Sequence, residues 1–183
     1  HGRSLDMLVF GRSASVLAFR LGDSDVVQVG GGQYDRHVAL FRLADRLDAI
    51  ALHAAMGDEV LCHRTAHVFN HEGGFGSAIS RAQHRTLDGP RGTFDVEALE
   101  AAWRADDPHH PITRLIVVEN SSNGGGGAVW PLEKYDAVTA WAHARGVAVH
   151  IDGARLMHAA LASDVAPARW AEVRISSSIS AAS

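Results

Sequence analysis

The feature that most constrains this chain is a regular alternation of short apolar runs and helix-length segments between Gly57 and Gly153. The runs at residues 60–62, 113–118 and 147–151 are apolar at both odd and even positions, as expected of strands covered on both faces. Helix-length connections between such strands form right-handed βαβ units. The sequence therefore predicts an α/β fold with a mostly parallel sheet flanked by helices.

The segments between these strands carry helix signals. Residues 95–103 place apolar side chains three and four positions apart, which predicts an amphipathic helix with Thr93 as its N-cap. Pro131 is expected to begin a helix that runs through His143 and ends at Arg145 and Gly146. A short helix is expected at residues 77–82, and the four glycines at 124–127 predict a flexible loop.

Composition excludes several classes of protein. With 46% hydrophobic and 21% charged residues, the 183-residue chain is an ordinary globular sequence rather than a disordered one. Lys and Arg number 17 against 21 Asp and Glu, without a basic block, so a nucleic-acid partner is not expected. No apolar run is long enough to span a membrane, and the single Cys62 cannot form an internal disulfide. We therefore expect a cytoplasmic protein with no membrane partner.

Patterning divides the chain into three parts. Residues 1–49 are poorly patterned, and a local reading-frame disruption around residues 42–49 would explain this. Residues 50–173 form the recognisable but incomplete α/β domain, and residues 174–183 form an irregular tail. Because the sequence begins without Met and ends in a Ser/Ala-rich stretch, we expect it to be a fragment.

Polar side chains follow each predicted strand. His63 and His67 come after the first strand, Glu119 and Asn120 after the second, and Asp152 after the third. In an open parallel sheet, ligands bind at the carboxyl ends of the strands. The pattern predicts a site there for an anionic ligand that contains a ring.

The run His-Ile-Asp-Gly-Ala-Arg-Leu at residues 150–156 resembles the pyridoxal-phosphate (PLP) enzymes of the threonine aldolase and β-eliminating lyase family, in particular the low-specificity L-threonine aldolases. Six further pieces that resemble this family occur in the expected order, at residues 57–60, 66–67, 72–74, 106–109, 113–120 and 130–132. The resemblance covers about residues 50–170. It implies part of the large domain of an aspartate-aminotransferase-like PLP-dependent transferase fold.

The resemblance also implies an activity. It indicates a lyase that cleaves a β-hydroxy-α-amino acid such as threonine into glycine and an aldehyde, with pyridoxal 5'-phosphate as cofactor. The full-length protein would bind a small amino-acid substrate and form a homo-oligomer. The alternatives are a β-eliminating amino-acid lyase of the same family, and an inactive α/β binding module that has lost the cofactor.

Three residues would contact the cofactor. PLP withdraws electrons best while its pyridine nitrogen is protonated, and a buried carboxylate stabilises that proton. Asp152 matches the family's residue in this role, and the alternative is an Asp that opens the turn before Gly153. His67 matches the imidazole that lies against the ring, and Arg155 matches an arginine that contacts cofactor and substrate carboxylate.

Further residues match the family near its substrate. His109 matches a histidine that assists deprotonation of the β-hydroxyl, although His110 beside it blurs the assignment. Glu72 and Asn120 match substrate-binding positions. For His67, His109 and Glu72 the alternative is an ordinary polar loop residue. Ser122 departs from the family, which usually has His at this position.

Two cofactor contacts of the family are not found. Its Schiff-base lysine follows the strand after Asp152, but the only lysine here is Lys134, in the predicted helix that begins at Pro131. The family's phosphate-binding turn would fall at residues 42–49, where the sequence reads Arg-Leu-Ala-Asp-Arg-Leu-Asp-Ala. The fragment alone is therefore expected to be inactive.

The chain also contains 12 histidines, and this raises a metal alternative. His63, His67 and His71 are spaced by four, as metal ligands on one helix face would be, with Glu72 as a fourth ligand. Asn70, Gly73 and Gly74 disfavour a long helix at this point. We therefore expect no metal site.

Overall fold

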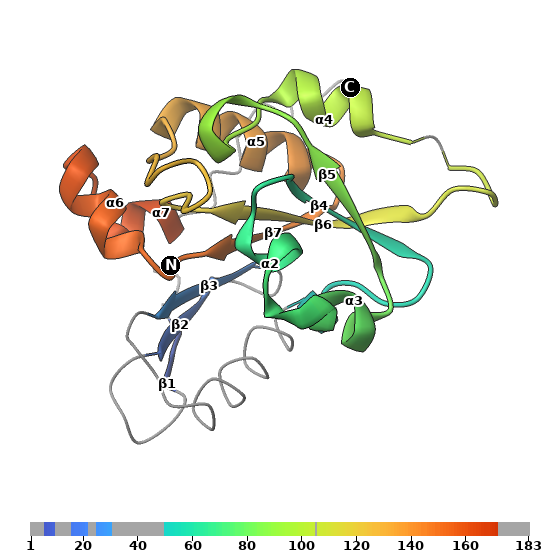
Figure 1. The fold of residues 1–183 in the computed structure, drawn as a ribbon, viewed down its shortest axis with the longest axis horizontal. Helices are drawn as coiled ribbons and strands as arrows, with labels where there is room; N and C mark the ends of the chain where they lie inside the picture. Colours follow the sequence, from blue (N-terminus) through green and yellow to red (C-terminus); the bar gives the residue numbers. More distant parts are fainter. Residues whose placement is uncertain (1–5, 10–15, 22–24, 31–49, 105, 172–183) are drawn as a thin grey trace, which may run out of the picture.

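A computed structural model describes residues 6–9, 16–21, 25–30, 50–104 and 106–171, and the account below concerns these residues. Their strands form one sheet in the order β1-β2-β3-β7-β6-β4-β5 (Figure 1). Strands β3, β7, β6, β4 and β5 are parallel, and β1 and β2 extend the sheet antiparallel to their neighbours. The strand bounds are β1 (Asp6–Val9), β2 (Val16–Leu21), β3 (Asp25–Gly30), β4 (Asp58–His63), β5 (Gln83–Leu87), β6 (Ile112–Glu119) and β7 (Ala148–Asp152).

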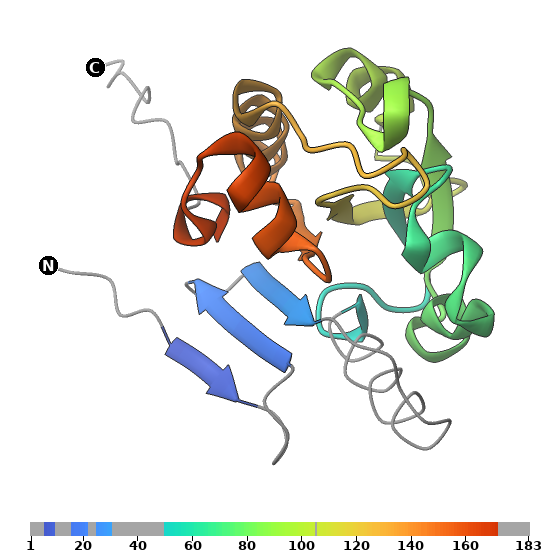
Figure 2. The same cartoon turned by 60° about the vertical axis from the view of Figure 1, so that its left-hand side comes forward.

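Helices lie on both sides of the sheet. Helices α4 and α5 cover one face, and α3 lies on the other side (Figures 1 and 2). Figure 2 also shows β1–β3 continuing the sheet beyond β7. The helix bounds are α2 (His67–Asn70), η1 (Glu72–Gly74), α3 (Phe75–Ser80), η2 (Pro90–Gly92), α4 (Val96–Ala102), α5 (Leu132–Ala144), α6 (Leu156–Ser163) and α7 (Pro167–Ala171).

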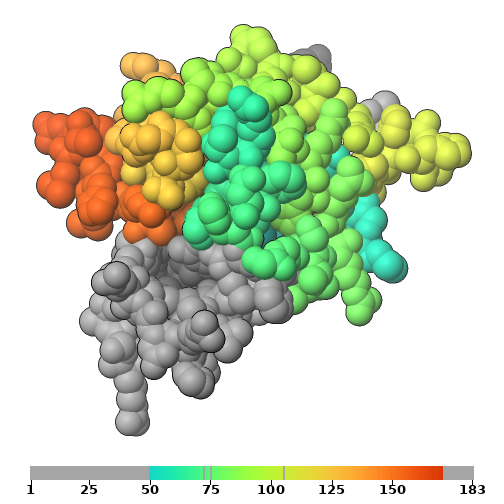
Figure 3. Space-filling view, viewed as in Figure 1, coloured from blue at the N-terminus to red at the C-terminus, as the bar shows by residue number. Residues whose placement is uncertain are grey.

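The two ends of the parallel strands look different. At the amino end of β6, the segment 106–111 projects from the body of the protein (Figures 1 and 3). At the carboxyl ends, the segment 120–130 packs against residues that follow β4. We call this second edge, formed by the carboxyl ends of β4, β6 and β7 and the segments that follow them, the carboxyl rim.

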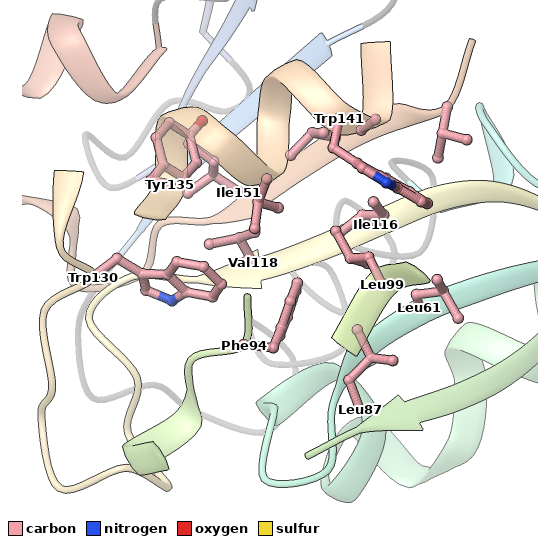
Figure 4. Packing of buried hydrophobic residues seen from close by; sticks show 14 of the residues in the cluster. Leu61, Leu87, Phe94, Leu99, Ile116, Val118, Trp130, Tyr135, Trp141 and Ile151 are labelled. Atoms are coloured by element: carbon pink, nitrogen blue, oxygen red, sulfur yellow. The ribbon is translucent and has the colours of Figure 1, made fainter. Parts of the chain in front are cut away.

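The core lies on both faces of the sheet, which explains the unbroken apolar runs. On β6, Ile116 and Val118 pack with α4 and α5, whereas Leu115 and Val117 pack on the opposite face (Figure 4). Because side chains alternate along a strand, two-sided burial requires apolar residues at both parities. The predicted strands at 60–62, 113–118 and 147–151 are confirmed as parallel strands of one sheet.

The helix predictions agree with the structure except at one cap. Helix α5 occupies the expected segment, with Arg145 as C-cap and Gly146 at φ +69°. The predicted N-cap of α4, Thr93, is wrong: the cap is Asp95, whose Oδ1 accepts a hydrogen bond from Ala98 N at 3.0 Å. The Thr93 hydroxyl donates to Pro90 O at 2.9 Å, so it is engaged in the preceding turn.

Several elements were not predicted. Strand β5 has exposed Gln83 and half-buried His84 and Arg85, because it pairs only with β4 in the described sheet and faces partly outward. Strands β1–β3 fall in the poorly patterned part of the chain. The suggested frame disruption at 42–49 and the tail at 174–183 lie outside the described residues. Among the described helices, none has the length and apolarity needed to cross a membrane.

Candidate active site

The carboxyl rim brings together the ends of β6 and β7. Glu119 and Asp152 are register partners at the last positions of the two strands, and Asn120 N donates to Asp152 O at 3.1 Å. Val149 and Ile151 of β7 pack on the α5 side, so alternation places Asp152 on the opposite face. Glu119 shares that face with Leu115 and Val117 of β6. Two carboxylates therefore lie side by side on one face of the sheet.

Asp152 is nearly fully buried, with 8% of its surface exposed. The N–H of Ala154 approaches its Oδ1 at 3.4 Å, a long contact. A buried carboxylate favours the charged form of a cationic ligand. This position suits a protonated ring nitrogen.

Glu119 is also buried, and both of its carboxylate oxygens accept backbone hydrogen bonds. Oε2 accepts from His67 N at 3.3 Å, and Oε1 accepts from Asn123 N at 3.1 Å. Burial raises the pKa of Glu119 above its ordinary value, and the negative charge of Asp152 adds to this rise. The two amide donors and the charge of His67 act in the opposite direction.

Asn120 contributes a buried donor. Its Oδ1 accepts from Trp130 N at 3.2 Å, which identifies the other amide atom as nitrogen. Nδ2 is buried and has no hydrogen-bond acceptor among the described residues. An unmet buried donor costs roughly 1–3 kcal/mol, so a ligand acceptor at this atom would be favoured. The substrate-binding role of Asn120 stays a prediction.

His67 begins α2, directly beside Glu119, and its ring stacks on His71 with centroids 4.5 Å apart. The metal alternative gains no support from this geometry. Helix α2 ends at Asn70, and the ring nitrogens of His63 are engaged with Thr65 Oγ1 at 2.8 Å and Gly89 O at 3.1 Å. Within the described ranges, no group of three or more His, Cys, Asp and Glu could hold a metal ion.

Two further predicted residues lie near the rim. Arg155 is the N-cap of α6, three residues after Asp152, and is half-buried. Glu72 has its backbone in η1, but its side chain lies outside the described part of the structure.

His109 is not brought to the carboxyl rim. It precedes β6, is exposed, and its Nδ1 lies 2.9 Å from Asp107 Oδ1. A strand of eight residues separates it from Glu119, a span of about 23 Å at about 3.3 Å per residue. The order of the motif along the chain placed His109 among the site residues, but its position before the strand puts it at the opposite edge of the sheet.

Lys134 also lies away from this face. It belongs to α5, which covers the face of the sheet opposite to Asp152. The only lysine of the sequence therefore does not reach the site.

In the glycine loop at 124–127, which was expected to be flexible, the first two glycines are closely packed. A Cβ at Gly124 would lie 2.6 Å from Thr65 O, and a Cβ at Gly125 would lie 1.9 Å from Arg91 O. Ser122 Oγ accepts from Gly125 N at 3.2 Å and fills the space over Gly92. In Figure 3 this loop, in gold, lies beside the segment after β4, in teal. Glycine serves here to let backbones approach closely.

The described residues fit the pyridine side of PLP. A buried carboxylate and an imidazole-bearing segment lie at one face of the strand ends. The family's phosphate-binding turn would fall at 42–49 and its lysine-bearing segment beyond 171, and both lie outside the described residues.

Comparisons with known proteins agree with this geometry. The profile of the beta-eliminating lyase family matches residues 37–181. The probable low-specificity L-threonine aldolase 2 of Arabidopsis thaliana is 32% identical over 165 residues, which are 88% of this chain and 46% of that protein. The low specificity L-threonine aldolase of Saccharomyces cerevisiae is 33% identical, over 66% of this chain and 31% of that protein. The chain thus spans less than half the length of these relatives.

Solved structures share the fold. A threonine aldolase from Leishmania major superposes with a TM-score of 0.58 at 24% identity, covering 64% of this chain and 34% of that one. A protein from Exiguobacterium, described as a putative aromatic amino acid beta-eliminating lyase/threonine aldolase, gives 0.51 at 17% identity, over 74% and 34% of the two chains. With the strand-end carboxylate and the sheet order, the match over most of its length shows that the chain belongs to the beta-eliminating lyase family.

Proposed function

We propose that the protein to which this chain belongs is a PLP-dependent aldolase that cleaves a β-hydroxy-α-amino acid, such as threonine, into glycine and an aldehyde. The observation that carries the proposal is the buried Asp152 at the end of β7, beside Glu119 and the His67 segment. The threonine aldolases among the relatives supply the reaction class.

Each of the predicted residues at the carboxyl rim would have a different role in the reaction. When bound, PLP supplies an electron sink for the bond between Cα and Cβ of the substrate. Asp152 would hold the proton on the ring nitrogen, because a buried carboxylate favours the charged form of its partner. The His67 imidazole would lie against the ring, and the Arg155 guanidinium would form a two-point pair with the substrate carboxylate.

The β-hydroxyl proton must leave for the bond to break. Among the predicted residues, His67 is the imidazole at the carboxyl rim, so it is our candidate acceptor of that proton. Ser122 stands where the family usually has His, and its Oγ accepts from Gly125 N in the packed loop. We therefore expect the preference for the β-substituent to differ from that of relatives with His.

A binding experiment on this chain tests the cofactor assignment without requiring turnover. Titration with PLP, followed by absorbance and tryptophan fluorescence, should show noncovalent binding that Asp152→Asn weakens by at least tenfold. The matched control is Asp164→Asn, at the exposed C-cap of α6. Equal affinities of wild type and Asp152→Asn, or a borohydride-trapped adduct at Lys134, would contradict the assignment.

A chimaera tests the reaction. Residues 50–171 would replace the corresponding segment of a complete low specificity L-threonine aldolase that carries its own lysine and phosphate-binding turn. We expect threonine to yield equimolar glycine and acetaldehyde, and Asp152→Asn to reduce turnover by orders of magnitude. Release of ammonia and a keto acid would instead support the β-eliminating alternative. A well-folded chimaera with neither activity would support the inactive binding module.

The cytoplasmic location and the homo-oligomeric assembly expected for the full-length protein remain predictions. Size-exclusion chromatography with light scattering on a complete relative that carries this segment would test the assembly.

A further inference from the structure

Glu119 hydrogen-bonds to two segments of the carboxyl rim that also pack on each other through Gly124 and Thr65. One oxygen binds the backbone N–H of His67, 52 residues earlier in the chain, and the other binds the N–H of Asn123 in the loop after β6. The strand end is itself fixed from the other side, because the indole Nε1 of Trp130 donates to Glu119 O at 3.2 Å. The carboxylate is thus a rigidly held bridge between the loop after β4 and the loop after β6.

Glu119 contacts the backbone of His67, and the position of this backbone determines where the His67 imidazole lies. His67 is the first residue of a single-turn helix whose N-cap makes no side-chain hydrogen bond, and its N–H donates to Glu119 Oε2. Asn123 begins the glycine loop that packs on Thr65 and Arg91. The Glu119 carboxylate therefore adds a hydrogen bond to each segment beyond the packing of the glycine loop on Thr65 and Arg91.

We propose that Glu119 is a positioning residue that sets the distance between the His67 imidazole and the Ser122–Gly127 loop, and so shapes the slot for a flat ring above Asp152. The reference to a ring rests on the proposed function, whereas the bridge itself does not. Glu119 has no part in the roles carried over from the family.

The charge of the bridge is coupled to the site. The titratable groups that influence Glu119 are Asp152 on β7 and His67 on α2, and burial and Asp152 raise its pKa. In a protonated carboxyl, the oxygen that carries the proton is a weaker acceptor, so the hydrogen bond from one of the two backbone N–H groups would weaken. The bridge is strongest in the ionised form.

The first test uses the unmodified 183-residue chain without cofactor. In a pH titration followed by NMR, the Glu119 carboxyl carbon and the amides of His67 and Asn123 should shift with one common midpoint, above 4.5. Asp152→Asn should lower that midpoint, since it removes a charge that raises the pKa of Glu119. Amides that ignore the carboxyl titration, or a midpoint that Asp152→Asn leaves in place, would overturn the proposal.

The second test breaks the bridge. In Glu119→Gln the single amide oxygen can accept from only one of the two N–H groups, so hydrogen exchange at His67 or Asn123 should accelerate at least tenfold. Exchange at Leu115 and Val117 in the core should stay unchanged, which separates loss of the bridge from loss of the fold. The control is Glu133→Gln in the exposed first turn of α5, which should change neither amide. Unchanged exchange at both amides in Glu119→Gln would refute the bridge.

A PLP-binding experiment distinguishes a failure of this inference from a failure of the proposed function. If PLP binds the wild type, Glu119→Gln should weaken binding severalfold and reduce the induced circular dichroism of the bound ring, while Glu133→Gln should do neither. Normal affinity and dichroism in Glu119→Gln would overturn the effect on the ring slot. If PLP binds neither protein, the proposed function fails, but the titration and exchange results still decide whether Glu119 is the bridge.

Discussion

Individual residues of the site were predictable to different degrees. The position of Asp152 at the edge of the sheet was predicted correctly, because a specific run of residues surrounds it and the end of a buried strand necessarily lies at that edge. The bridging role of Glu119 was not found, because it depends on a contact 52 residues away in sequence. His109 was misplaced for a related reason: a motif gives the order of residues along the chain but not the edge of the sheet that each one reaches.

Cys62 illustrates how burial controls chemistry at a single residue. The thiol is completely buried in β4, and burial raises its pKa to about 12. Because the thiolate is the reactive form, we expect no measurable reaction with a thiol reagent in the native chain at pH 8. The assay is the absorbance of released thionitrobenzoate, with the urea-unfolded chain as control. Stoichiometric modification within minutes under native conditions would show that β4 opens readily.

Elements were predictable where packing leaves a pattern in the sequence. The strands buried on both faces, β4, β6 and β7, give apolar runs that identify them. Edge strand β5 gives no such run because its partly exposed face is polar, so it was missed. The close packing of Gly124 and Gly125 was not predicted, because a glycine required for close packing looks the same in sequence as a glycine required for mobility.

Substitutions in this loop should separate packing from backbone strain. Gly125→Ala would place a methyl group 1.9 Å from Arg91 O, so we expect a loss of about 2–3 kcal/mol in the free energy of unfolding. Gly127→Ala has open space but φ +74°, so its cost should be only about 1 kcal/mol. Urea denaturation of both variants measures the difference. Equal losses would mean that the loop relaxes away from residues 89–92.

The whole sheet determines which segments can meet at the site. Strand β3 runs parallel to β7 with Gln28 opposite Asp152, so its carboxyl end at Gly30 reaches the same rim. The unpatterned start of the chain therefore contributes a strand next to the site, which local sequence could not reveal because the pairing is long-range. The register partners of Asp152, Gln28 and Glu119, come from two other strands, β3 and β6, so the site depends on the assembled sheet.

The pH dependence of stability combines contributions from opposite ends of the structure. His84 on β5 has a pKa lowered mainly by burial, so the unfolded chain binds its proton first as the pH falls. Its stabilising contribution is complete above about 6.5 and is lost as the pH falls through the lowered pKa. Glu119 has a raised pKa, so its contribution is complete below about 4.5 and is lost as the pH rises through the raised value.

The contributions of His84 and Glu119 to the free energy of unfolding change with pH in opposite directions. Removing His84 should therefore leave the pH dependence that Glu119 contributes. We expect the free energy of unfolding of the wild type to fall between pH 6.5 and pH 5, and His84→Asn to reduce that fall. Asn retains a polar group near Ser77 Oγ, which lies 2.7 Å from His84 Nδ1. Urea denaturation at half-unit pH intervals provides the measurement. The control is His158→Asn, at an exposed position of α6. If His84→Asn shows the same fall in the free energy of unfolding between pH 6.5 and pH 5 as the wild type, burial of His84 is not the cause of that fall. If His158→Asn removes the fall, the cause is an exposed histidine.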